Sequence, residues 1–311
     1  MSRATMPAAS RRQLPLGDEI FLDHVGHFVR DVQAASRALR RAGFAPTPVS
    51  IQADKDPATG RLVPTGLGNV TAMFARGYME VLFKSSDTPL AGELDAALAR
   101  RAGLHLAAFS VIDAAAARER LAAAGFPVRD LARMQRPVET ERGPGIAAFT
   151  ISRVKPMTMP EGRIQILTHH TEDTVWQPRW LSHPNSVRDL IDVVIAVGDV
   201  EEAARRFARF TGRSATFTPG GALIRLDRGG VYLVSHDRAT EKLPEVAVTS
   251  LPFMIGYALG VESLAAAEAA IDGADLEWRA LEDGIVATFP AELGQGAWFF
   301  VEAPEGLPWR H

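Results

Sequence analysis

One pattern of apolar and polar positions recurs along the chain. Residues 21–29 form a short apolar run of strand-forming residues. They lead into a stretch with Ala and Leu at helical spacing, in which Asp31 stands at the N-cap position and Gly43 follows the last turn. The same order returns at 104–125, with Asp113 and Gly125 again 12 positions apart. The sequence therefore predicts a repeated structural unit.

Two further copies follow. The third begins at 190–197 and continues to Asp199 and Gly212, and the fourth begins at 253–259 and continues to Ser263 and Gly273. Each predicted helix is followed by two or three short strand-type runs separated by turn residues. These runs lie at 69–74 and 78–83, 146–151 and 163–167, 222–226 and 231–234, and 284–289 and 297–301. The pattern predicts an α+β fold built from four βαβββ modules.

The modules divide the chain into two predicted domains. The first, 20–171, contains modules 20–86 and 103–171, and the second, 188–304, contains modules 188–237 and 250–304. Residues 172–187 lack periodicity and contain prolines together with Trp176 and Trp180, so we expect a packed connector there. We expect residues 1–19 to form a flexible N-terminal tail.

The composition limits which ligands, partners and cellular locations can be expected. The 311 residues are 47% hydrophobic and 23% charged, an ordinary globular balance. No cysteine is present, so a metal would need His, Asp, Glu or Gln as ligands. The net charge of −3, without a basic stripe, argues against nucleic-acid binding. No apolar run has the length of a membrane span or signal peptide, so we expect a cytoplasmic protein that does not bind membranes.

The first module carries a recognisable set of residues. It opens with Leu-Asp-His-Val at 22–25, has Asp31 seven residues after His24, and ends in Gly-Tyr-Met-Glu-Val-Leu at 77–82. This resembles the vicinal oxygen chelate superfamily, which includes glyoxalase I, the extradiol dioxygenases and the bleomycin-resistance proteins. The resemblance, closest to the glyoxalase-like proteins, covers about residues 20–303. It implies a glyoxalase/dioxygenase-like fold of two half-open barrels, each formed by paired modules around a divalent metal.

The family pattern places metal ligands on the first and last strands of each module. Carried onto this sequence, it implies His24, Glu80 and His105 as ligands and Gln165 as a fourth, with Glu80 also catalytic. The separations agree, at 56 residues from His24 to Glu80 and 60 from His105 to Gln165. Two imidazoles and a carboxylate suit Fe(II), and a further oxygen ligand suits a Lewis-acidic ion, so Fe, Zn, Ni and Mn all stay open.

One spacing departs from the pattern. His24 precedes Asp31 by seven residues, whereas His105 precedes Asp113 by eight. Since side chains alternate along a strand, this slip would turn His105 out of the barrel unless a bulge near Ala107 restored the register. The second domain has Asp192 where the first has His24, and we expect it to be a structural partner.

Three other residues are candidates for substrate binding: Asn69, Arg153 and His169. Residues 54–66 are polar and rich in Pro and Gly, and we expect a lid or insertion loop. The leading hypothesis is a metal-dependent glyoxalase-like or dioxygenase-like enzyme, a lyase, isomerase or dioxygenase, acting on adjacent oxygens of a small molecule. The alternatives are a metal-free binding or resistance protein and a decayed structural family member. We expect a small-molecule substrate and a homodimer as partners.

Overall fold

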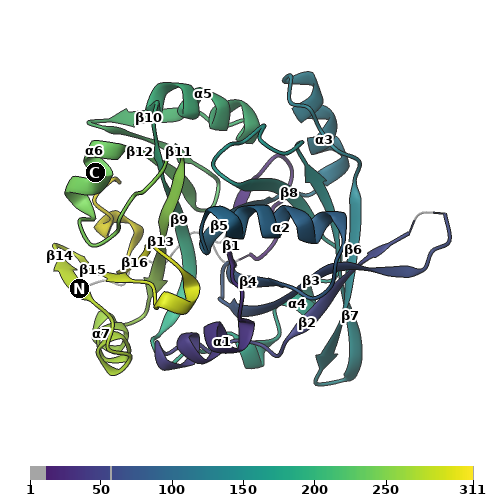
Figure 1. Cartoon of the computed structure of the whole chain (residues 1–311), viewed down its shortest axis with the longest axis horizontal. Coiled ribbons are helices and arrows are strands. Elements are labelled where there is room, and N and C mark those ends of the chain that lie inside the picture. Colours follow the sequence, from purple (N-terminus) through teal and green to yellow (C-terminus); the bar gives the residue numbers. More distant parts are fainter. Residues whose placement is uncertain (1–11, 57, 311) are drawn as a thin grey trace.

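The computed structural model describes residues 12–56 and 58–310, which form two eight-stranded sheets lying side by side (Figure 1). Each sheet is built from two modules, so the predicted α+β class and four-module organisation are confirmed. Residues 1–11 of the predicted tail lie outside the described residues. No helix in the described part of the chain is long and apolar enough to cross a membrane.

The N-terminal sheet closes into a barrel in the order β1-β4-β3-β2-β6-β7-β8-β5. Pairing of β2 with β6, through Ala53 with Gln135 and Asp54 with Met134, closes the side where a half-open barrel was expected. Its strands are β1 (Phe21–Phe28), β2 (Ser50–Lys55), β3 (Leu62–Met73), β4 (Tyr78–Lys84), β5 (Gly103–Ser110), β6 (Ala132–Thr140), β7 (Gly143–Arg153) and β8 (Arg163–His169). Its helices are α1 (Val32–Arg41), α2 (Pro89–Arg100) and α3 (Ala114–Ala123).

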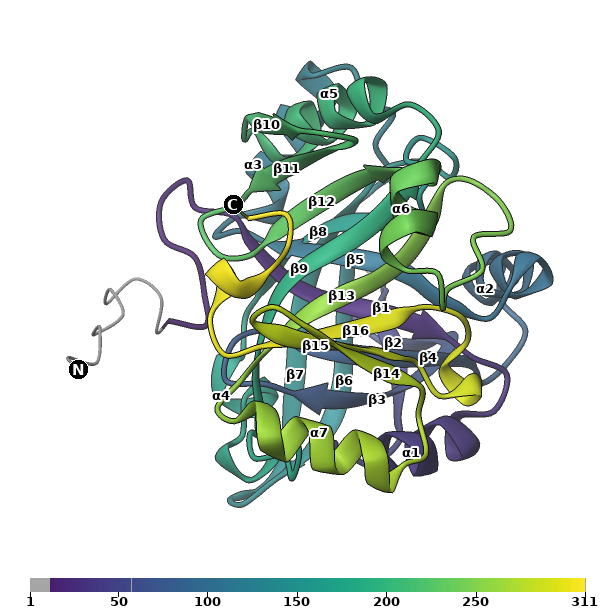
Figure 2. The same cartoon turned by 90° about the vertical axis from the view of Figure 1, so that its left-hand side faces the viewer.

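The C-terminal sheet stays open, in the order β10-β11-β12-β9-β13-β16-β15-β14 (Figure 2). Its strands are β9 (Val187–Val197), β10 (Ala215–Thr218), β11 (Gly221–Arg225), β12 (Gly230–Ser235), β13 (Phe253–Val261), β14 (Trp278–Leu281), β15 (Gly284–Thr288) and β16 (Ala297–Val301). Its helices are α5 (Val200–Thr211), α6 (His236–Lys242) and α7 (Leu264–Gly273), and a short helix α4 (Glu172–Val175) lies between the sheets in sequence.

The module helices begin at the predicted caps. The side chains of Asp31, Asp113, Asp199 and Ser263 accept hydrogen bonds from backbone N–H groups of the first turn. After the first three helices the chain turns through a glycine in the left-handed region, at Gly43, Gly125 and Gly212. The fourth differs from the prediction, because Gly273 belongs to α7 and Asp275, with φ 55°, adopts the left-handed conformation instead.

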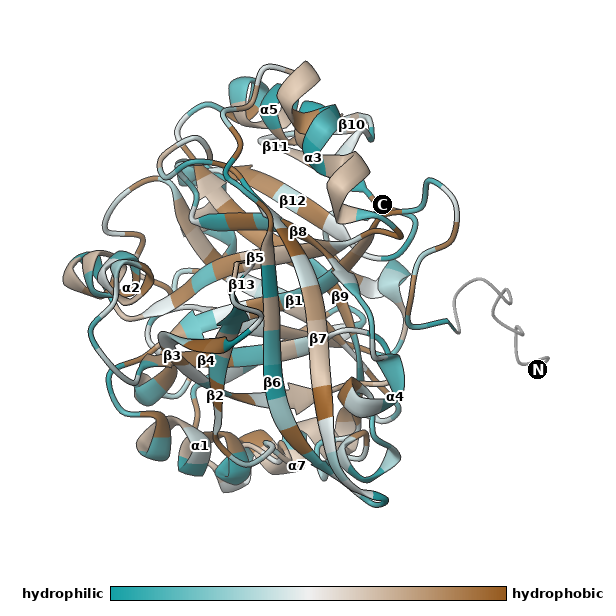
Figure 3. Cartoon of the chain, turned by 90° about the vertical axis from the view of Figure 1, so that its right-hand side faces the viewer, coloured by the Kyte–Doolittle hydropathy of each residue, from teal (hydrophilic) through white to brown (hydrophobic). Residues whose placement is uncertain are grey.

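Several elements lack a periodic signal and were not predicted. Helix α2 joins the first two modules and lies across one end of the barrel (Figure 1). Strand β6 is mostly hydrophilic (Figure 3) and contains Pro137. Residues 54–66, expected as a loop, belong largely to the β2–β3 hairpin, with Lys55 paired to Leu62. Strands β10 and β14 are four residues each, too short for a period to show.

One continuous core joins the two sheets. Leu22 and Val25 on the outer face of β1 belong to the same buried cluster as Ile195 of β9 and Tyr257 of β13. His27 lies in this layer, with Nε2 3.0 Å from the hydroxyl of Tyr257 and Nδ1 3.0 Å from the carbonyl oxygen of Leu293. The C-terminal sheet therefore covers the outer face of the strand that carries His24.

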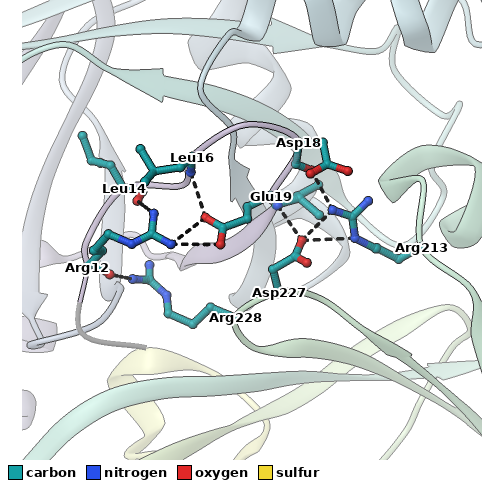
Figure 4. A network of polar contacts seen from close by, with 9 residues as sticks. Arg12, Leu14, Leu16, Asp18, Glu19, Arg213, Asp227 and Arg228 are labelled. Carbon is teal, nitrogen blue, oxygen red and sulfur yellow. Dashed lines mark hydrogen bonds and ion pairs between the residues drawn. The ribbon is translucent and has the colours of Figure 1, made fainter. Parts of the chain in front are cut away.

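The segment before β1 docks on the turn between β11 and β12 (Figure 4). The guanidinium group of Arg12 binds Glu19 at 2.9 Å, and Arg228 donates to the carbonyl oxygen of Arg12 at 2.7 Å. Asp227 accepts hydrogen bonds from the backbone N–H of Ile20 at 2.8 Å and from Arg213 at 2.6 Å. These contacts tie the entry into β1 to the C-terminal sheet.

Candidate functional site

Two β-bulges in the β1–β5 ladder determine which side chains enter the barrel. The first places Asp23 between Leu22 and His24 without a partner on β5, so Asp23 and His24 both reach the buried interior. The second skips His105 between Leu104 and Leu106. The barrel interior therefore receives two neighbouring polar side chains from β1 and none from this part of β5.

Asp23 is fully buried between two imidazole rings. Its Oδ1 lies 2.7 Å from Nδ1 of His24, and its Oδ2 lies 2.9 Å from Nε2 of His169. Burial alone would raise the pKa of Asp23, but the charge and hydrogen bonds of His169 and His24 outweigh it and hold that pKa well below its usual range. An ionised carboxylate only accepts, so Nδ1 of His24 carries a proton and donates it.

His24 consequently presents Nε2 to the barrel interior. Its ring stacks on Tyr78, with centroids 4.4 Å apart, and Nε2 lies 3.8 Å from Oε2 of Glu80. Glu80 is fixed from its other side, because Oε1 accepts hydrogen bonds from the amides of Asn69 and Gln52. One carboxylate oxygen and one imidazole nitrogen are thus left facing each other across the cavity.

Three arginines line the same cavity: Arg136 of β6, Arg153 of β7 and Arg163 of β8. Nε of Arg153 donates to Oε1 of Gln165 at 3.0 Å. Arg136 has no hydrogen-bond or ion-pair partner among the residues that the structure describes. Burial lowers the pKa of Arg136, and burial together with the charge of Arg153 lowers that of Arg163 to about 10. All three remain cationic at neutral pH.

The cavity has a volume of about 30 Å³, room for roughly two water molecules. It brings together five of the predicted site residues: His24, Asn69, Glu80, Arg153 and Gln165. His169 does not line it; its side chain is fully buried and acts on His24 through Asp23. Glu80 is the single carboxylate of the lining and stands against three guanidinium groups, so the cavity is electropositive.

His105 does not join His24 and Glu80 as the predicted ligand set requires. At the bulge its ring turns out of the barrel, stacks on Phe28 with centroids 5.3 Å apart, and lies with Nε2 3.0 Å from the carbonyl oxygen of Arg101. Leu106 and Ala108 take the inward positions of β5 instead. The extra residue between His105 and Asp113 therefore does change the face on which His105 lies, and no bulge near Ala107 restores the register.

The residues around the cavity do not fit a divalent metal ion. Within residues 12–56 and 58–310, no three His, Asp or Glu side chains converge as a ligand group. His24 and Glu80 supply two donors, while the oxygen of Gln165 already accepts from Arg153. A dication would also sit beside three buried cations, with which its interaction is repulsive.

Sequence reasoning missed four residues of the site: Asp23, Gln52, Arg136 and Arg163. Asp23 stands inside the recognised Leu-Asp-His-Val motif, and its place next to His24 was the available signal. Gln52 and Arg136 lie on β2 and β6, which were not predicted as strands, so nothing indicated that they face the barrel. Arg163 begins a predicted strand but carries no motif.

Solved structures share this architecture. A hypothetical protein from Staphylococcus aureus aligns with a TM-score of 0.64 at 8% identity, covering 90% of this chain and 98% of that one. A variant of 4-hydroxymandelate synthase from Streptomyces coelicolor gives 0.53 at 14% identity, covering 91% and 92%. An Mn(II)-bound glyoxalase from Novosphingobium aromaticivorans gives 0.52 at 12% identity, covering 91% and 81%. At these identities the likeness concerns the fold.

No curated protein matches the chain in sequence. A family model described as a glyoxalase-like domain matches residues 22–211, from the start of β1 to the end of α5. The matched region contains the whole barrel and more than half of the chain. The chain therefore belongs to the glyoxalase-like domain family, as the resemblance of its first module to the vicinal oxygen chelate superfamily indicated.

Proposed function

We propose that the N-terminal barrel binds a small anionic molecule and that His24 and Glu80 transfer a proton on it, without a metal ion. The protein would then be a lyase or isomerase of the proton-transfer type. The observation that carries this proposal is the cavity lining, in which three arginines surround one imidazole–carboxylate pair. Among the described residues no carboxylate pairs with Arg136 or Arg153, and burying a guanidinium group without a counter-ion is costly, so an anionic ligand would recover that free energy.

Residues of the barrel can carry out both anion binding and proton transfer. Arg136 and Arg153 bind the anionic group, since their guanidinium groups have hydrogen-bond donors that no carboxylate occupies. Nε2 of His24 removes a proton from the bound molecule. Asp23 keeps the imidazole in the required tautomer and stabilises the imidazolium ion that forms. This proton passes from the imidazolium ion to Oε2 of Glu80, which faces Nε2 at 3.8 Å, and Glu80, fixed by Asn69 and Gln52, returns it to another atom of the bound molecule.

The metal-dependent hypothesis would need the ligand set His24, Glu80, His105 and Gln165, and a metal-free binding protein would need the arginines alone. These alternatives predict different results when His24 is replaced. A metal site loses its ion when His24 is replaced, a proton-transfer site loses turnover but keeps its ligand, and a binding protein loses neither.

The test uses 2-oxobutanoate, a small carboxylate with exchangeable C–H bonds. Titration calorimetry measures binding, and NMR in D₂O measures deuterium incorporation. We expect binding and exchange in the wild type, exchange at least 100-fold slower with retained binding in His24→Gln, and binding at least tenfold weaker in Arg136→Gln. Absence of binding, exchange that does not depend on His24, or one tightly bound metal per chain that is lost in His24→Ala would overturn the proposal.

A further inference from the structure

A second and larger pocket lies beside α2, at the end of the barrel that this helix covers (Figure 1). Its volume is about 410 Å³, against about 30 Å³ for the barrel cavity. Arg153 and Arg163 line both spaces, so their side chains form the partition between them. The barrel cavity alone leaves no room for a ligand longer than a short-chain carboxylate, whereas the two spaces together have the size of an ordinary ligand site.

The charge of the outer pocket matches that of the barrel cavity. Five of its lining side chains are basic, and Glu93 of α2 is its one acidic residue. Glu93 binds Arg129 at 2.7 Å and lies 3.6 Å from Arg163, so it is already neutralised. The carboxylates of Asp54, Glu93 and Glu80 act on Arg153 through their charge, and none of them is hydrogen-bonded to it. The partition therefore presents cationic groups to both sides.

The rest of the outer pocket is apolar. Its wall includes Phe28, on whose ring Arg163 and His105 both pack. Burial lowers the pKa of His105 to about 3, with Arg101 adding to the shift, so this imidazole is neutral and contributes an uncharged ring. At the rim Met157 is 70% exposed and has a φ of 64°, a conformation that is costly for a residue with a side chain. Strained backbone positions of this kind cluster at ligand and active sites.

We propose that the pocket beside α2 is the outer part of the ligand site, and that the ligand is a carboxylate with an apolar tail. The carboxylate enters the barrel cavity among the arginines, and the tail lies in the outer pocket against Phe28 and Met157. Arginine side chains are long and have many rotamers, so Arg153 and Arg163 can turn to admit the chain between the two spaces. This inference rests on the proposed function, because it assumes that the barrel binds an anion.

The test compares straight-chain carboxylates from acetate to octanoate by titration calorimetry. In the wild type the affinity should rise about threefold to fourfold with each added methylene that the pocket buries. Ala96→Trp fills the outer pocket from α2, and we expect it to weaken octanoate binding at least tenfold while acetate binding changes less than twofold. Ala99→Trp is the matched control, since Ala99 is exposed on the same helix and does not line the pocket.

The possible failures are distinguishable. If acetate binds but affinity does not rise with chain length, or if Ala96→Trp binds octanoate as the wild type does, this inference is wrong and the proposed function stands. If no carboxylate binds, not even acetate, the proposed function fails and this inference fails with it. If Ala99→Trp weakens octanoate as much as Ala96→Trp, the effect belongs to α2 in general and the assignment of the pocket is overturned.

Discussion

Asp23 and His24 are neighbours in one strand, yet Oδ1 of Asp23 accepts a hydrogen bond from Nδ1 of His24 at 2.7 Å inside the barrel. In a regular strand the two side chains would point to opposite faces. The bulge at Asp23 removes this constraint, and it allows the same carboxylate to bind His169 as well. The orientation of the imidazole is therefore set by a local irregularity in β1.

Replacing Asp23 by Asn should change the tautomer of one of the two histidines that Asp23 contacts, His24 or His169. The carboxylate accepts from two histidines, whereas an amide offers one accepting oxygen and one donating nitrogen. One of His24 and His169 must then change its protonated nitrogen. We expect long-range ¹⁵N–¹H NMR to show this change and deuterium exchange into 2-oxobutanoate to slow at least tenfold. Asp237→Asn, which alters an exposed carboxylate of α6 outside the cavity lining, is the control. Unchanged tautomers and rates in Asp23→Asn would contradict the assignment.

Stability should fall in acid before the carboxylates titrate. Burial lowers the pKa of His27 to about 4 and that of His105 to about 3, against about 6.5 in the unfolded chain. Because the folded values are depressed, the unfolded state binds more protons below pH 6.5. The free energy of unfolding should then decrease by up to about 2.7 kcal/mol per pH unit between pH 6 and 4.5.

Urea denaturation at a series of pH values measures this slope. His27→Gln should roughly halve it, and His236→Gln should leave it unchanged, because His236 is exposed. A stability that is flat between pH 6.5 and 4.5, or the same slope in His27→Gln as in the wild type, would contradict the prediction.

Gly162 holds β8 against β5. Its φ is 156°, and a Cβ atom there would lie 2.4 Å from the backbone oxygen of His105. Gly162→Ala should therefore destabilise the protein by roughly 1–3 kcal/mol and weaken carboxylate binding, because Arg163 and Gln165 follow on β8. Gly92→Ala is the control. A Cβ on Gly92 meets no atom within 4 Å, so alanine should be neutral or stabilising in α2. Equal stabilities for the two variants would refute this account.

Tyr257 connects the two sheets through its hydroxyl. The oxygen accepts a hydrogen bond from Nε1 of Trp298 at 2.7 Å and lies 3.0 Å from Nε2 of His27. Tyr257→Phe leaves a buried indole N–H without a partner, which should cost about 1–3 kcal/mol. Chemical denaturation followed by tryptophan fluorescence and circular dichroism should still show one coincident transition. Two separated transitions would show that the sheets unfold independently.

The repeat could be read from the sequence because the strands and helices at the centre of each module have a clear period. Strands β1 and β16 and the caps at Asp31, Asp113 and Asp199 follow that pattern. The peripheral strands were missed because they pack on one side only and, as in β6, carry polar residues and a proline. The spacing indicated that His105 turns outward unless a bulge intervenes, but a bulge leaves no mark in composition, so the orientations of Asp23 and His105 required coordinates.

The continuous core described above makes β1 dependent on the C-terminal sheet for the burial of its outer face. An excised segment 20–171 would keep the cavity residues but expose Leu22, Val25 and His27, which β9 and β13 cover in the whole chain. β1 would then lose the support that positions Asp23 and His24 from behind. Under the proposed function, substitutions where the C-terminal sheet contacts β1 should therefore reduce turnover even though they lie outside the cavity lining.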